Sequence, residues 1–163
     1  MAFDINNPYF RTKVLTASPE QLRLMLIEGA IHFMELGRDA LEVKNFEVSF
    51  ENLSQAKAIV LELINALRPE HDPQLAEKLS GLYTFMFTEL TQAGFDKDPK
   101  RVNSVIRLME YERETWILLM EKLAKDNGED STALSANTLP EVADNYQSQE
   151  KPSGPRRPIS MQG

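Results

Sequence analysis

The feature that most constrains this chain is a helical spacing of apolar residues that continues from Ser18 to Asn127. Apolar side chains recur three or four residues apart over this span, as on one face of a helix. No stretch alternates apolar and polar residues with the period of two that marks a half-buried strand. The pattern therefore predicts an all-α fold.

Start and stop signals divide this span into four helices of about 20 to 28 residues, each some 30 to 40 Å long. The first opens with Ser18-Pro19-Glu20-Gln21, which has the sequence of a capping box with proline in the first turn. Asp-Pro pairs open the third and fourth helices in the same way. Short linkers between helices of similar length favour an antiparallel four-helix bundle. The predicted helices run from Ser18 to about Val43, from Phe46 to Pro69, from Asp72 to Gly94, and from Asp98 to Asn127-Gly128.

Two segments flank the predicted bundle. Residues 1–17 are too apolar for a free tail, so we expect them to form an N-terminal capping segment against the bundle. Their apolar side chains include Phe3, Ile5, Tyr9, Phe10, Val14 and Leu15. Residues 128–163 are rich in Pro, Ser, Asn and Gln, a composition that cannot offset the entropy of ordering, and we expect a disordered C-terminal tail. The predicted organisation is thus a cap at 1–17, a bundle at 18–127 and a tail at 128–163.

Composition excludes several classes of function. The 163-residue chain has 18 Lys and Arg against 25 Asp and Glu, a net charge of −7 that argues against a nucleic-acid partner. It has no cysteine, which excludes thiolate catalysis and cysteine zinc sites. No apolar run approaches the roughly 20 residues of a membrane span, and no basic and apolar leader opens the chain. We therefore expect a cytoplasmic protein with no membrane insertion.

The sequence holds no recognisable catalytic or metal-binding motif. Di-iron bundles carry a glutamate three residues before each ligand histidine. This chain has two histidines, His32 and His71, and the residues three positions before them are Gly29 and Arg68. We expect no metal, no cofactor and no enzymatic activity. A histidine phosphotransfer or signalling bundle built on His32 stays open as an alternative. Glu112 lies near the inward stripe of the last helix, where we expect Arg113 or a polar group of another helix to satisfy it.

The four helices carry more apolar surface than one core can use. On the first helix, a face with Leu22, Leu26, Gly29 and Phe33 is expected to point inward, which leaves a second apolar stripe. Tyr83 and Trp116 are expected in the core. Exposed apolar stripes on a monomer mark a partner surface, here for an amphipathic helix or an extended apolar segment. A homodimer in which these stripes meet their own copies is the alternative. The surplus positions are Leu24, Ile27, Ile31, Ile59, Phe85, Phe87, Leu108, Tyr111 and Leu118.

Short motifs over about residues 5–125 resemble the FliS family of flagellar export chaperones. Asn7-Pro8-Tyr9-Phe10 and Thr16-Ala17-Ser18-Pro19-Glu20-Gln21-Leu22 resemble its N-terminal signature. Leu79-x-x-Leu82-Tyr83 resembles its third helix, and Arg113-Glu114-Thr115-Trp116 its last. The chain departs from the family at Ile27-Glu28, where Tyr-Asp is usual, and in a proline-bearing linker at 68–73.

The resemblance implies a chaperone of the bacterial cytosol that binds the C-terminal helical region of flagellin. Such a chaperone masks the segment that would polymerise and delivers its client to the flagellar export apparatus. The surplus apolar positions would then be the flagellin-binding residues. The resemblance also implies that the N-terminal segment lies over the bundle and shifts when the client binds, with Tyr9 and Phe10 as its anchors.

Overall fold

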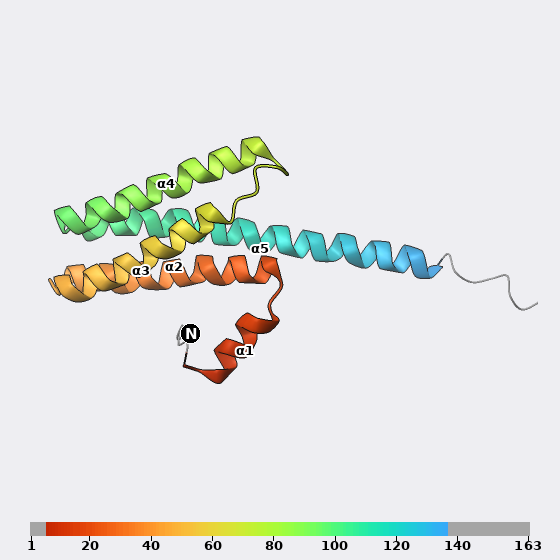
Figure 1. Ribbon diagram of the computed structural model, residues 1–163, viewed down its shortest axis with the longest axis horizontal. Coiled ribbons are helices and arrows are strands. Elements are labelled where there is room, and N and C mark those ends of the chain that lie inside the picture. The colour runs from red at the N-terminus through yellow and green to blue at the C-terminus, as the bar shows by residue number, and fades with distance from the viewer. Residues whose placement is uncertain (1–5, 137–163) are drawn as a thin grey trace, which may run out of the picture. The chain divides into compact units, whose positions relative to one another are not determined.

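The computed structural model describes residues 6–136, with side chains to residue 128, and within that range the chain forms helices and no strand (Figure 1). This confirms the predicted all-α class. None of the described helices is long and apolar enough to cross a membrane. The helices are α1 (Pro8–Thr16), α2 (Pro19–Glu42), α3 (Phe46–Asn65), α4 (Pro73–Asp96) and α5 (Pro99–Ala136).

Helices α2, α4 and α5 begin where the capping signals predict, whereas α1 was not predicted as a helix. Ser18 Oγ accepts a hydrogen bond from the Gln21 amide at 3.2 Å, and the Ser18 amide donates to Gln21 Oε1 at 2.9 Å, which completes the capping box. The Asp72 carboxylate accepts from the Leu75 amide at 3.1 Å and so caps α4. The N-terminal helix α1 uses the same device, because Asn7 Oδ1 accepts from the Tyr9 amide and Pro8 fills the first turn.

The helix ends differ more from the prediction. Helix α3 ends at Asn65, before Pro69, and α4 passes Gly94 to end at Asp96, where Lys97 takes the left-handed conformation with φ 55°. Helix α5 does not end at Asn127-Gly128 but continues to Ala136. One glycine in a helix interior costs only about 1 kcal/mol, which a long helix absorbs. The rest of the predicted tail, 137–163, lies outside the described residues.

Helices α2, α3 and α4 and the first part of α5 share one hydrophobic core. They lie side by side in Figure 1. Hydrogen bonds join α2 to α5 in opposite order along the two helices, Arg23 with Glu112 and Arg38 with Asn103. The largest fully buried side chains include Met34, Leu63, Tyr83, Met86, Leu90 and Met109.

The buried face of α2 is centred on Ala30, Met34 and Gly37 rather than on the predicted Leu22, Leu26 and Phe33, although Gly29 is buried as predicted. Small residues explain the difference, because they let α3 approach closely. A Cβ atom at Gly37 would lie 2.7 Å from Leu53 Cδ2. Leu22, Leu26 and Phe33 are therefore left partly exposed.

Candidate binding surface

The predicted binding residues fall into three groups by exposure. Phe85 on α4 and Tyr111 and Leu118 on α5 are more than half exposed, as an apolar contact surface requires. Leu24, Ile31, Ile59, Phe87 and Leu108 are half-buried. Ile27 is 0% exposed and belongs to the core, so its prediction as a surface residue is wrong. It is buried because α2 presents the side with Ala30 and Met34 to the other helices.

An apolar groove of about 300 Å³ lies between α1, α2 and α3. Its walls are almost wholly apolar, and Ile59 is the predicted binding residue among them. Phe10 and Val14 of α1 form one side, whereas Tyr9, the other predicted anchor, is exposed. Phe10 and Val14, but not Tyr9, are thus the residues of α1 that line this groove. The lining is Phe10, Val14, Leu22, Met25, Leu26, Gly29, Phe33 and Ile59.

The structure also exposes aromatic residues that the sequence analysis did not single out. Phe50 on α3 and Phe95 on α4 are 71% and 78% exposed, and Phe46 joins them along a second groove between these helices. The sequence could have predicted that Phe46 and Phe50 share a surface, because they lie four residues apart and therefore on the same side of a helix.

A buried polar cluster ties α2, α4 and α5 together. The Tyr83 hydroxyl donates to Glu112 Oε1, and Arg23 Nη2 lies 2.6 Å from the Tyr83 oxygen and 3.4 Å from Glu112 Oε1. Burial raises the pKa of Tyr83 well above its ordinary value, and the hydrogen bond to Glu112 raises it further. Tyr83 and Arg23 of other helices thus contact Glu112 Oε1, as predicted, whereas Glu112 Oε2 has no hydrogen-bond partner. Arg113 pairs instead with Glu28 at 3.0 Å.

Trp116 of α5 packs beside this cluster and contacts the start of α2. The Arg23 guanidinium lies 4.9 Å from the centre of its ring, and Trp116 Nε1 donates to the Glu20 carbonyl at 3.0 Å. Trp116 is half-buried, and Tyr83 is fully buried as expected. The arrangement holds side chains in place and offers no open reactive group.

The remaining chemical candidate is His32. It is half-buried on α2, with its ring centroid 5.6 Å from that of Phe33. Among the described residues no group of three or more His, Asp or Glu side chains could hold a metal ion.

Comparison with known proteins places the chain in a family. The family model described as "Flagellar protein FliS" matches residues 1–123, which include α1 to α4 and most of α5. The chain belongs to the FliS family. The resemblance seen in the N-terminal signature and the last helix is thereby confirmed.

Curated FliS relatives match the same region. The flagellar secretion chaperone FliS of Vibrio cholerae is 31% identical over 105 residues, which cover 64% of this chain and 77% of that protein. The protein of the same name from Campylobacter jejuni is 32% identical over 110 residues, 68% of this chain and 86% of its own. That of Bacillus subtilis is 30% identical over 125 residues, 75% of this chain and 92% of its own.

The FliS match includes both grooves and the Arg23–Tyr83–Glu112 cluster, since all their residues precede Leu123. The end of the matched region is also apolar. Trp116 of α5 is hydrogen-bonded to Glu20 near the start of α2. Three leucines that follow Trp116 on α5 are exposed: Leu118, Leu119 and Leu123.

Proposed function

We propose that this chain is a cytoplasmic chaperone that binds the C-terminal helical region of flagellin. It would prevent premature polymerisation of flagellin and assist its secretion through the flagellar export apparatus. The family match over residues 1–123 carries this proposal. Exposed apolar side chains on α4 and α5 support it, because they supply a surface that apolar helix faces can occupy.

Binding is the whole mechanism in this proposal, and no chemical step is required. The client would lay its apolar faces on Phe85, Tyr111 and Leu118 and on the half-buried set of Leu24, Ile31, Ile59, Phe87 and Leu108. A typical specific interface buries about 800 Å² on each partner, and a client that folds on binding loses part of that gain to ordering.

The architecture proposed for this role is an antiparallel four-helix bundle of α2 to α5 with α1 as its cap. The opposite order of the α2 and α5 contacts supports the antiparallel arrangement. Phe10 and Val14 beside the groove support the cap. A client that enters this groove would displace α1, which has no buried residue to hold it.

A titration with a flagellin C-terminal peptide, followed by calorimetry and circular dichroism, tests the proposal. We expect saturable one-to-one binding with a gain of helix. Sedimentation of the same samples distinguishes client binding from a homodimer. No saturation at high micromolar peptide would overturn the proposal.

A matched pair of variants locates the surface. Leu118→Asp on α5 is expected to raise the Kd at least tenfold, because it places a charge where an apolar contact is proposed. Leu61→Asp on α3 makes the same change at another exposed leucine outside the proposed surface, and its Kd should stay near that of the parent chain. If the two substitutions changed the Kd equally, Leu118 of α5 would not belong to the binding surface.

A further inference from the structure

We propose that the groove between α3 and α4 is a second docking site, for an amphipathic helical segment that carries carboxylates beside its apolar face. This partner is distinct from the client of the proposed function, and the two would bind at the same time.

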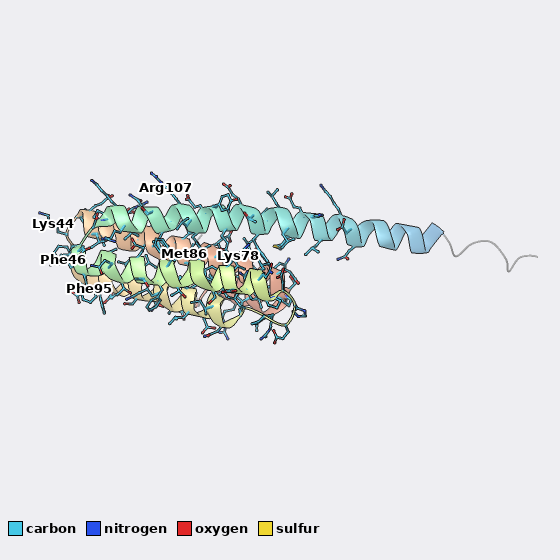
Figure 2. The ribbon with its side chains drawn as sticks, turned by 90° about the horizontal axis from the view of Figure 1, so that it is seen from above. Lys44, Phe46, Lys78, Met86, Phe95 and Arg107 are labelled. Atoms are coloured by element: carbon cyan, nitrogen blue, oxygen red, sulfur yellow. The ribbon has the colours of Figure 1, made fainter. Side chains whose placement is uncertain are left out.

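The groove lies where the first half of α3 faces the end of α4. Leu53 and Leu90 form its floor, and Phe46, Phe50 and Phe95 line it. Figure 2 shows Phe46 and Phe95 at the same end of the helices. Its volume of about 180 Å³ is below the roughly 300 to 1,000 Å³ of small-molecule sites, so it fits the side chains of a docked segment better than a whole ligand.

An unsatisfied polar atom in the groove points to a ligand. Ser49 is 2% exposed and lines the groove, and its hydroxyl has no hydrogen-bond partner. Buried hydroxyl groups in folded proteins are nearly always hydrogen-bonded. A polar group of a docked segment would supply the missing partner.

The charges around the groove select the chemistry of that segment. Lys57 lines the groove, and no Asp or Glu does, although the chain carries 25 acidic residues. Lys97 Nζ lies 4.2 Å from the ring centre of Phe46, and Lys57 Nζ lies 5.7 Å from that of Phe87. Among the described residues neither ammonium group has a carboxylate partner. A partner with carboxylates next to its apolar face would pair with both.

This groove and the groove beside α1 lie on different sides of α3. Ile59 lines the groove beside α1, whereas Lys57, Ser54 and Leu53 line the one beside α4. Residues two apart on a helix point about 200° away from each other. A segment in one groove therefore leaves the other open, which is why we infer a second partner.

Two glycines of α4 provide a matched test. Gly94 lines the groove and Gly81 does not, and a Cβ atom at either position would meet nothing within 4 Å. Gly94→Leu should fill the groove without disturbing the core, and Gly81→Leu makes the same change elsewhere on the same helix. The probe is a synthetic helical peptide with two leucines four residues apart and glutamates beside them, together with a version in which lysines replace the glutamates.

Fluorescence anisotropy of the labelled peptide with the full chain gives the Kd. We expect saturable binding of the acidic peptide, at least tenfold weaker binding to Gly94→Leu and to Lys57→Glu, and unchanged binding to Gly81→Leu. The lysine version should bind at least tenfold more weakly. Saturating flagellin peptide should leave the Kd unchanged.

Three results would overturn the inference: no saturation by the acidic peptide, equal binding to the two leucine variants, or displacement by the flagellin peptide. The last would assign the groove to the client instead. Because the flagellin titration is measured separately, each of these failures is distinguishable from failure of the proposed function.

Discussion

At the scale of single residues, the Arg23–Tyr83–Glu112 cluster is the part of the structure whose stability depends most on each partner being present. It places a charge pair where water is largely excluded, with side-chain exposures of 15% for Arg23 and 10% for Glu112. A buried charge is costly unless its partners remain, so each group depends on the others.

Glu112→Ala should therefore destabilise the fold by about 3 to 5 kcal/mol, because it leaves the Arg23 charge and the Tyr83 hydroxyl without their acceptor. The control is Arg113→Ala, which breaks the more exposed pair with Glu28 and should cost at most about 1 kcal/mol. Urea denaturation followed by circular dichroism measures both. Similar losses for the two variants would contradict a special role for the buried cluster.

Tyr83 gives the fold a dependence on alkaline pH. Its pKa is raised in the folded chain, so the unfolded chain releases the proton first. Its contribution to stability is complete below the ordinary tyrosine pKa of about 10 and is lost as the pH rises above that value. The free energy of unfolding should fall more steeply between about pH 10 and 11 in the parent chain than in Tyr83→Phe. The same steepness in the parent chain and in Tyr83→Phe would refute the assignment.

At the scale of elements, the starts of the helices could be predicted and the rotation of α2 could not. Ser18 and Asp72 act through their neighbours in sequence, so their caps are visible in the chain itself. Asn7-Pro8 carried the same signal for α1. The inward face of α2 was ambiguous because leucine, isoleucine and phenylalanine occur all round it. The small residues Ala30, Gly37 and Ala40 were the better guide, since close approach of a second helix requires them.

The candidate site was predicted only in part, for a related reason. Phe85, Tyr111 and Leu118 are exposed because they lie outside any apolar stripe that a neighbour covers. Whether Phe50 and Phe95 are covered depends on how α3 and α4 pack, which local spacing does not specify.

The close approach of α2 and α3 at Gly37 is itself testable. Gly37→Ala should destabilise the chain by about 1 to 3 kcal/mol, because the new methyl group would overlap Leu53. Gly81→Ala, in open space on α4, should instead stabilise it by up to about 1 kcal/mol through helix propensity. Thermal unfolding of the two variants checks the opposite signs. Stabilisation by both would mean that Leu53 moves aside and that the contact does not fix the helix spacing.

At the scale of the whole molecule, two boundaries coincide at Leu123. The family match ends there, and so does the first compact unit of the structure, Met1–Leu123. The buried hydrophobic residues of that unit lie between Ile27 and Met109, so burial of the core does not depend on residues beyond it.

A chain that ends at Leu123 should therefore keep the stability and the proposed binding of the full chain. We expect its free energy of unfolding to differ by less than about 1 kcal/mol, since the described side chains beyond Leu123, at residues 124–128, are all exposed. Its Kd for the flagellin peptide should stay within about threefold of the parent value, or roughly 0.7 kcal/mol. Urea denaturation and calorimetry measure the two quantities. Weaker binding with unchanged stability would place part of the client surface beyond Leu123. A large loss of stability would instead mean that the long α5 helix must be intact for its first half to pack.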